Sequence, residues 1–289
     1  MLTYFWSFSM KVTILQPKGY CAGVARAINI ALQARKEHQD NDVNVLGMLV
    51  HNHHVTKLLE TNNITIIDDL STAKDGSVIV FNADGHTQEQ YKLALKKQMI
   101  IYNAICPKVE KNLVTIGQTI KQGHQIIYIG QAHHQETQIA LSVSDQVILY
   151  DDKQGIDWSK VKDEKPLVLN QTTLNSLEIV NLYDDIKTHL PNAVISNEIC
   201  PTTRQRQEAV INVQDVDAII VVGDKVSSNS NRLYEIAKSS HPEAFVTMVS
   251  DVNELPIKEL QNKNHIAISS GASTPSDVID EIYNKLISL

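Results

Sequence analysis

The sequence contains few cysteines, and those it has are widely spaced. Cys21, Cys106 and Cys200 are separated by 85 and 94 residues. An odd count without close pairs argues against a disulfide framework and against a CxxC zinc site. The chain also has no dinucleotide or flavin fingerprint, no low-complexity stretch and no long linker. Three isolated thiols that converge in the fold would instead hold an iron-sulfur cluster with one iron left open.

The charge and the opening segment argue against other classes of protein. A formal net charge of -7 gives no reason to expect nucleic acid as a partner. The apolar opening, residues 1–9, is too short for a membrane span and lacks the basic leader and cleavage site of a signal peptide. We expect these residues to be a loose tail or an upstream-start artefact. With 289 residues and 43% hydrophobic content, we expect a cytoplasmic enzyme with a sizeable core and no membrane partner.

A repeated pattern follows each cysteine. An apolar run precedes the thiol each time, as in MIIYNAIC, and two strands that end in polar clusters come after it. The first cluster follows after 30, 28 and 28 residues, counted to His51, His134 and Ser228. The second follows after 63, 66 and 73 residues, counted to Asp84, Thr172 and Ser273. Ordinary strand-to-helix loops, which are also polar, are the alternative explanation for any single cluster.

The repeat predicts three βα modules, which we place at residues 10–98, 99–192 and 193–289. Polar clusters at the carboxyl ends of strands line the ligand crevice of an open α/β sheet. Three modules of this kind would therefore surround one central pocket.

Continuous Val/Ile/Leu runs predict strands buried on both faces of parallel sheets. We expect them at residues 12–17, 43–50, 77–83, 99–105, 125–131, 146–150, 166–170, 193–199, 218–223, 244–249 and 265–270. Helical periodicity lies between the strands. The apolar face of the first helix consists of Val24, Ala27, Ile28, Ala31 and Leu32. A helix after the SSNSN segment would be capped by Ser228, Asn229 or Ser230.

Several segments carry a resemblance to a known family. They are GYCAGVARAI (19–28), VHN (50–52), CPKV (106–109), the HxE of His134 and Glu136, QTTL (171–174), RQEAV (206–210), VVGDKVSSNSNRL (221–233) and SGAST (270–274). In this order and spacing they resemble the IspH/LytB family of 4-hydroxy-3-methylbut-2-enyl diphosphate reductases over residues 11–287. The GYCAGV and SSNSNRL blocks are the specific ones.

The resemblance implies a fold, a cofactor and a reaction. The fold is α/β, with three similar modules in a pseudo-threefold cloverleaf around a 4Fe-4S cluster. Cys21, Cys106 and Cys200 match the family's cluster ligands. The reaction is a two-electron removal of an allylic hydroxyl that gives isopentenyl and dimethylallyl diphosphates. Electrons would come from a small partner such as a ferredoxin or flavodoxin.

The resemblance also implies roles for individual residues. Glu136 matches the proton donor and Thr172 its relay to the substrate oxygen. The set that matches the family's diphosphate ligands is Ser227, Ser228, Asn229 and Ser273, and His51 and His134 would add donors or charge. Structural alternatives remain for both groups. Glu136 could simply favour a helix N-terminus, and the Ser/Asn cluster could simply cap a helix.

Asp84 is the main departure from the family pattern. It stands where the family has a histidine that binds diphosphate. A carboxylate there should repel a diphosphate unless it is protonated, turned away or paired with Lys or Arg. The sequence therefore leaves three functions open: the diphosphate reductase, a divergent cluster-dependent reductase of another substrate, or a non-catalytic cluster sensor.

Overall fold

The computed structural model describes residues 10–196 and 198–289. It divides into two compact units: unit 1 combines the chain up to Tyr20 with Thr202–Leu289, and unit 2 comprises Cys21–Pro201. The expectation for residues 1–9 lies outside the described residues. Among the described helices, none combines the length and the apolar character needed to cross a bilayer.

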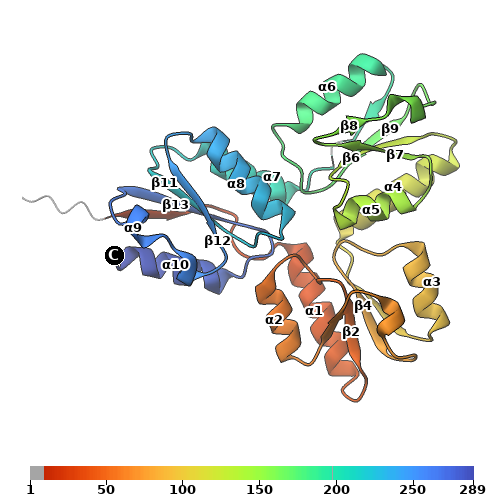
Figure 1. Ribbon diagram of the computed structural model, residues 1–289, viewed down its shortest axis with the longest axis horizontal. Coiled ribbons are helices and arrows are strands. Elements are labelled where there is room, and N and C mark those ends of the chain that lie inside the picture. Colours follow the sequence, from red (N-terminus) through yellow and green to blue (C-terminus); the bar gives the residue numbers. More distant parts are fainter. Residues whose placement is uncertain (1–9, 197) are drawn as a thin grey trace, which may run out of the picture. The chain divides into compact units, whose positions relative to one another are not determined.

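Unit 1 is built on one parallel sheet with the strand order β1-β13-β11-β12 (Figure 1). The strands are β1 (Lys11–Ile14), β11 (Ala218–Val222), β12 (Phe245–Val249) and β13 (His265–Ser270). Neighbouring residues of β11 are buried on opposite faces. Ile220 packs with residues of α10 (Ser276–Ile287), whereas Ile219 packs with residues of α7 (Pro201–Asn212) and α8 (Ser228–Ser240). Burial on both faces explains why β11 reads as an unbroken apolar run.

The first sheet of unit 2 has the order β3-β2-β4-β5, and all its pairs are parallel. The strands are β2 (Val43–Leu46), β3 (Thr65–Ile67), β4 (Val78–Phe81) and β5 (Ile100–Asn103). The accompanying helices are α1 (Ala22–Glu37), α2 (His53–Thr61) and α3 (Gln88–Lys96). The buried face of α1 is close to the predicted one, with Ala34 buried and Leu32 only partly buried.

The second sheet of unit 2 has the order β10-β9-β6-β7-β8 and is parallel except for the β7-β8 pair. The strands are β6 (Ile126–Gly130), β7 (Val147–Asp151), β8 (Gly155–Ile156), β9 (Leu167–Asn170) and β10 (Val194–Ile195). Helix α6 (Ile179–His189) covers one face, where Ile127 and Ile129 are buried. Helices α4 (Pro107–Lys121) and α5 (Gln135–Ser142) cover the other face, where Tyr128 is buried (Figure 1).

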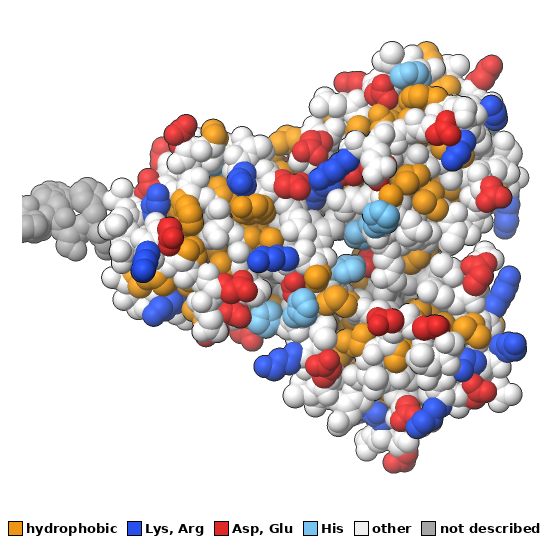
Figure 2. All heavy atoms as spheres, viewed as in Figure 1, with side chains coloured by type: hydrophobic (Ala, Val, Ile, Leu, Met, Phe, Trp, Pro, Cys, Tyr) orange, Lys and Arg blue, Asp and Glu red, His pale blue; other side chains and the backbone are white. Residues whose placement is uncertain are grey.

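Short elements complete the chain. They are the 3-10 helices Leu70–Thr72, Trp158–Lys160 and Val252–Glu254, and α9 (Ile257–Leu260). Basic and acidic side chains are interspersed over the face drawn in Figure 2. On that face, the described residues therefore form no concentrated patch of positive or of negative charge.

The predicted α/β fold with three mainly parallel sheets is confirmed. The sheets do not follow the predicted module boundaries. β1, which precedes Cys21, pairs with β13 near the C-terminus. β5, which precedes Cys106, pairs with β4 of the preceding predicted module, and β10, which precedes Cys200, pairs with β9 of the preceding predicted module. The reason is that a crossover connection, not sequence order, selects the neighbour of a parallel strand.

Candidate functional site

Each cysteine stands directly before the first residue of a helix. Cys21 precedes α1, Cys106 precedes α4 and Cys200 precedes α7. The Sγ atom of Cys21 accepts the N–H of Val24 over 3.4 Å, so this thiol caps its helix. Unpaired N–H groups and the helix dipole favour negative charge at this end of a helix. Each cysteine therefore stands beside the N-terminus of a helix, the end that attracts negative charge.

The three thiols lie close together in unit 2. They are free and partly exposed. A Cβ atom added to Gly23 would lie 2.9 Å from Sγ of Cys106 and 3.8 Å from Sγ of Cys21. Burial raises the pKa of Cys106, and the neighbouring thiols of Cys21 and Cys200 raise it further. Because Gly23 has no side chain, the space beside the thiols of Cys21 and Cys106 stays open, and a bulkier residue would fill it.

Backbone hydrogen bonds connect two cysteines to the polar loops of the candidate site. The N–H of Cys106 donates to the carbonyl of Ala83 over 2.9 Å, next to Asp84. The N–H of Cys200 donates to the carbonyl of Thr172 over 3.0 Å. The loops that follow β4 and β9 are consequently held against the cysteine segments.

Glu136 is a buried acid in the first turn of α5, with only 2% of the residue exposed. Its carboxyl group accepts the N–H of Thr172 at 3.0 and 3.2 Å, the Thr172 hydroxyl at 2.9 Å and the Tyr128 hydroxyl at 3.0 Å. Burial and the charge of Asp84 raise the pKa of Glu136 to about 7, although these hydrogen bonds oppose the rise. Near pH 7 the group can therefore exist as an acid and deliver a proton.

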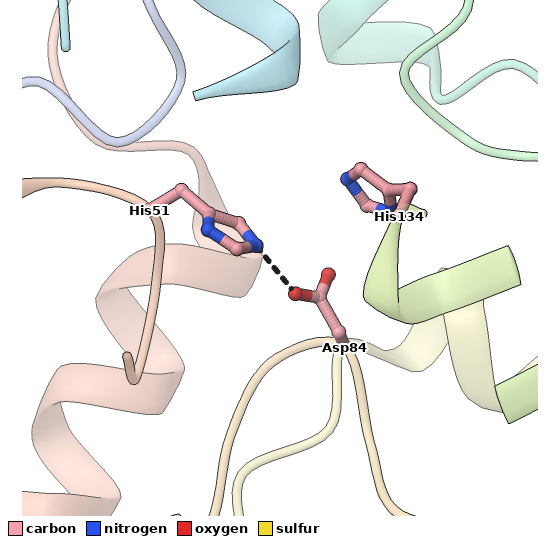
Figure 3. Close-up of side chains that lie close together, drawn as sticks. All are labelled: His51, Asp84 and His134. Atoms are coloured by element: carbon pink, nitrogen blue, oxygen red, sulfur yellow. Dashed lines mark hydrogen bonds and ion pairs between the residues drawn. The ribbon is translucent and has the colours of Figure 1, made fainter. Parts of the chain in front are cut away.

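Asp84 lies with His51 and His134 in a second cluster (Figure 3). Its Oδ2 atom is 2.9 Å from Nε2 of His51, and the two side chains are 16% and 30% exposed. Burial would raise the pKa of Asp84, but the hydrogen bond from His51, its charge and the nearby His134 ring lower it overall. Asp84 is thus paired as an anion, with a histidine rather than with Lys or Arg.

The same cluster has the residue types of a metal site. Each of the three side chains offers one ligand atom, and these atoms lie within 4.8 Å of one another. However, Nδ1 of His134 accepts the N–H of Glu136 over 3.2 Å, as the cap of α5. Its lone pair is therefore engaged, and burial, which lowers the pKa of His134, favours a neutral ring with the hydrogen on Nε2. In this tautomer His134 is a hydrogen-bond donor and not a metal ligand.

The other predicted ligands of diphosphate belong to unit 1. Ser227 caps α8 by accepting the N–H of Ser230, which corrects the expectation that one of the next three residues is the cap. Asn229 is 6% exposed, and neither its amide nitrogen nor its amide oxygen has a protein partner. Ser273 is buried in the loop after β13, and β13 is the neighbour of β11. A buried amide without partners beside the N-terminus of α8 is suited to an anionic ligand.

Tyr128 is the residue of this site that sequence reasoning missed. It lies in the middle of β6, within the run IIYIG, and is fully buried. Its hydroxyl donates to Glu136. A lone hydroxyl in an otherwise apolar central strand is a detectable signal, because a buried tyrosine usually needs a hydrogen-bond partner.

Comparison with known proteins identifies the family. The family model described as "LytB protein" matches residues 12–287. The chain belongs to the LytB family. A 4-hydroxy-3-methylbut-2-enyl diphosphate reductase of Macrococcus caseolyticus (strain JCSC5402) is 36% identical over 95% of this chain and 88% of the relative. A relative of the same description from Bacillus cereus (strain AH187) is 34% identical over 94% and 89%.

Solved structures of LytB-type reductases have the same fold. The E-1-hydroxy-2-methyl-but-2-enyl-4-diphosphate reductase of Plasmodium falciparum aligns with a TM-score of 0.86 and 27% identity, over 96% of this chain and 88% of that one. A structure of (E)-4-hydroxy-3-methyl-but-2-enyl diphosphate reductase, described as the terminal enzyme of the non-mevalonate pathway, gives a TM-score of 0.69 and 26% identity. It covers 97% of this chain and 100% of that chain. The similarity therefore extends over nearly the whole LytB fold.

Proposed function

We propose that this chain is a 4-hydroxy-3-methylbut-2-enyl diphosphate reductase of the non-mevalonate pathway. The observation that carries the proposal is the full-length similarity to reductases of this description, at 36% identity over 95% of the chain. The reaction breaks the bond between carbon and the hydroxyl oxygen, forms a carbon–hydrogen bond and releases water. It consumes two electrons and two protons, and the products are isopentenyl and dimethylallyl diphosphates.

The cofactor that we propose is a 4Fe-4S cluster held by Cys21, Cys106 and Cys200. Three free thiols fit this group, two of them beside Gly23 and the third, Cys200, close enough to act on Cys106. Thiolates are the usual ligands of such a cluster, and the fourth iron would stay open. When bound, the cluster supplies electrons and a Lewis acid for the substrate hydroxyl. A ferredoxin or flavodoxin is the proposed source of the electrons.

The protein itself supplies the proton for the departing hydroxyl. Glu136 is the proposed donor, since its raised pKa keeps a proton available near pH 7. Thr172 is the proposed relay, because its hydroxyl lies 2.9 Å from Oε2 of Glu136 and can accept that proton while it releases its own. Burial of both residues keeps bulk water from competing for the proton.

The diphosphate of the substrate needs many hydrogen-bond donors. We assign this role to His51, His134, Ser227, Ser228, Asn229 and Ser273. The unpartnered amide of Asn229 and the helix N-terminus capped by Ser227 support the assignment. The hydrogen on Nε2 of His134 provides a further donor. Asp84 is counterbalanced by His51 and does not stand as an isolated negative charge.

An anaerobic assay tests the proposal. The protein, reconstituted with iron and sulfide, is given 4-hydroxy-3-methylbut-2-enyl diphosphate and a chemical reductant, and products are identified by mass spectrometry. We expect both isopentenyl and dimethylallyl diphosphates, and no product from Cys200→Ala, which should also lose the cluster absorption. A fully loaded cluster without any product would instead favour a divergent reductase of another substrate.

A further inference from the structure

The two oxygens of the Glu136 carboxyl group have different surroundings. Oε1 lies 3.0 Å from the hydroxyl of Tyr128 and 3.0 Å from the backbone nitrogen of Thr172. Oε2 lies 2.9 Å from the Thr172 hydroxyl and 3.2 Å from the same nitrogen. The Thr172 hydroxyl can reverse its direction, because it can donate or accept, whereas a backbone N–H can only donate. The direction of the Tyr128 hydroxyl therefore determines whether Oε1 or Oε2 of Glu136 carries the proton.

The geometry directs the hydrogen of Tyr128 at Glu136. The Tyr128 hydroxyl donates to Oε1 of Glu136 over 3.0 Å. Asn112 of α4 lies near the same tyrosine and opposes the burial-driven rise of its pKa. The amide nitrogen of Asn112 itself donates to the carbonyl of Asn170 over 3.2 Å. Because a tyrosine hydroxyl carries one hydrogen, Tyr128 acts on Glu136 as a single donor.

Burial keeps this arrangement closed to solvent. Tyr128 is 0% exposed, Asn112 is 2% exposed, and α4 and α5 cover this face of the sheet. The Tyr128 hydroxyl is therefore shielded from bulk water. Leaving its hydrogen without an acceptor would be unfavourable in such a place.

We propose that Tyr128 is a positioning residue that keeps the transferable proton of Glu136 on Oε2, the oxygen that faces Thr172. Oε1 already accepts two hydrogens, from Tyr128 and from the Thr172 N–H, so a proton placed there would meet the hydrogen of Tyr128. On Oε2 the proton points to the Thr172 hydroxyl, from which the next transfer starts. The inference rests on the proposed function, in which Glu136 supplies a proton to the substrate.

Other ionisable groups also act on Glu136, and they can be kept constant. Asp84 comes from the loop after β4, with His51 bound to it, and His134 caps the same helix. Replacing the Tyr128 hydroxyl leaves all three in place. Tyr128→Phe also preserves the ring and nearly all of the side-chain volume, so this substitution isolates one hydrogen bond.

The test measures protonation and turnover of the cluster-loaded protein. The carboxyl stretching band of Glu136, assigned by its disappearance in Glu136→Gln, is followed by infrared spectroscopy as a function of pH. In Tyr128→Phe we expect its midpoint to rise by about one pH unit, because a hydrogen bond that favours the carboxylate is lost. We also expect kcat to fall about tenfold below the midpoint with KM little changed, since the proton is no longer confined to Oε2.

Tyr150→Phe is the matched control. Tyr150 lies in β7, the neighbour of β6, and its hydroxyl donates to Asp185 over 2.7 Å. This variant also removes a hydrogen bond between tyrosine and a carboxylate in the same sheet, and it should leave the Glu136 midpoint and kcat unchanged.

The outcomes separate this inference from the proposed function. If Tyr128→Phe moves neither the Glu136 midpoint nor the pH profile of kcat, Tyr128 does not position the proton. If Tyr128→Phe lowers stability alone, as a merely structural residue would, the inference is equally overturned. The midpoint of the Glu136 carboxyl band could shift in Tyr128→Phe while neither the unsubstituted protein nor any variant reduces the substrate. In that case the hydrogen-bond role of Tyr128 stands and the proposed reaction is wrong.

Discussion

The Asp84 carboxylate lies 2.9 Å from His51, and the same carboxylate raises the pKa of Glu136. One side chain thus acts on a proposed diphosphate ligand and on the proposed proton donor. The sequence predicted that Asp84 would repel a diphosphate unless it is protonated, turned away or paired with Lys or Arg. The structure replaces that view with a paired anion that has two separate effects, and each effect can be measured.

Replacing Asp84 should strengthen substrate binding. Asp84→His removes a negative charge and adds a possible donor, so we expect KM to fall and kcat/KM to rise by about fivefold, the effect of roughly 1 kcal/mol at a separation of about 4 Å in a largely screened site. Steady-state kinetics on both proteins measures the change. An unchanged or lower kcat/KM would mean that Asp84 has a positive role with the natural substrate.

Removing the same charge should change the pH dependence in a defined direction. The negative charge of Asp84 raises the pKa of Glu136, so Asp84→Asn should lower it. Glu136 must be protonated to act as an acid, and activity is lost as pH rises through its pKa. The alkaline limb of kcat against pH should therefore move to lower pH in Asp84→Asn. A limb that stays in place would show that another group limits turnover.

Glu136→Gln should lose turnover but not the cofactor. Glutamine keeps the shape of the side chain and cannot transfer a proton, so kcat should fall by at least about 100-fold. The absorption spectrum of the cluster and the binding of inorganic pyrophosphate should change little. If Glu136→Gln retains full turnover, the proton comes from a different residue.

The buried acid should also make stability depend on pH. The pKa of Glu136 is about 7 in the folded protein against an ordinary 4.5. The folded state therefore binds the extra proton, and this contribution is complete below pH 4.5 and is lost as pH rises through about 7. It amounts to roughly 3 kcal/mol of unfolding free energy.

Denaturant unfolding at several pH values measures this contribution. Between pH 5 and pH 8, Glu136→Gln should show a smaller decline in unfolding free energy than the unchanged protein. Replacing the exposed Glu110 by Gln is the control and should leave the decline as it is. Equal slopes for all three proteins would indicate that Glu136 titrates normally.

Gly23→Ala should impair cluster loading without removing a ligand. The added methyl group would lie 2.9 Å from Sγ of Cys106. A free thiol can rotate away from it, whereas a thiol that binds iron cannot, so we expect at least a severalfold loss of bound iron with a smaller effect on folding. Gly117→Ala, in α4 with nothing within 4 Å, is the control. It should keep the cluster and gain about 0.5 to 1 kcal/mol of stability. Normal iron content in Gly23→Ala would place the cluster elsewhere.

The fold class was accessible from the sequence because parallel strands buried on both faces are unbroken apolar runs. β11 and β6 were recognised in this way. β3 and β8 were missed, because segments of three and two residues are too short to show a period. Which strands share a sheet also could not be predicted from the sequence, since nothing in the residues of β1 specifies that its partner is β13.

The candidate site was predictable where a motif carried it. The cysteine spacing and the HxE segment pointed to Cys21, Cys106, Cys200 and Glu136, and the structure brings the three thiols together. Two features required coordinates. The pairing of Asp84 with His51 joins residues 33 positions apart. The hydrogen bond of Tyr128 depends on which face of β6 carries α5, and a strand flanked by helices on both sides gives no sign of that choice.

The pairing of β1 with β13 has a consequence for the order in which the chain folds. Lys11 pairs with His265, so β1 can pair only after β13, more than 250 residues later in the chain, has been synthesised. The sheets of unit 2 use only residues 43–103 and 126–195, and they can form on the ribosome while β1 is still without its partner. The sheet of unit 1 is thus completed last. A chain cut before His265 would retain both sheets of unit 2, but β1 would have no partner strand and could pair with another chain.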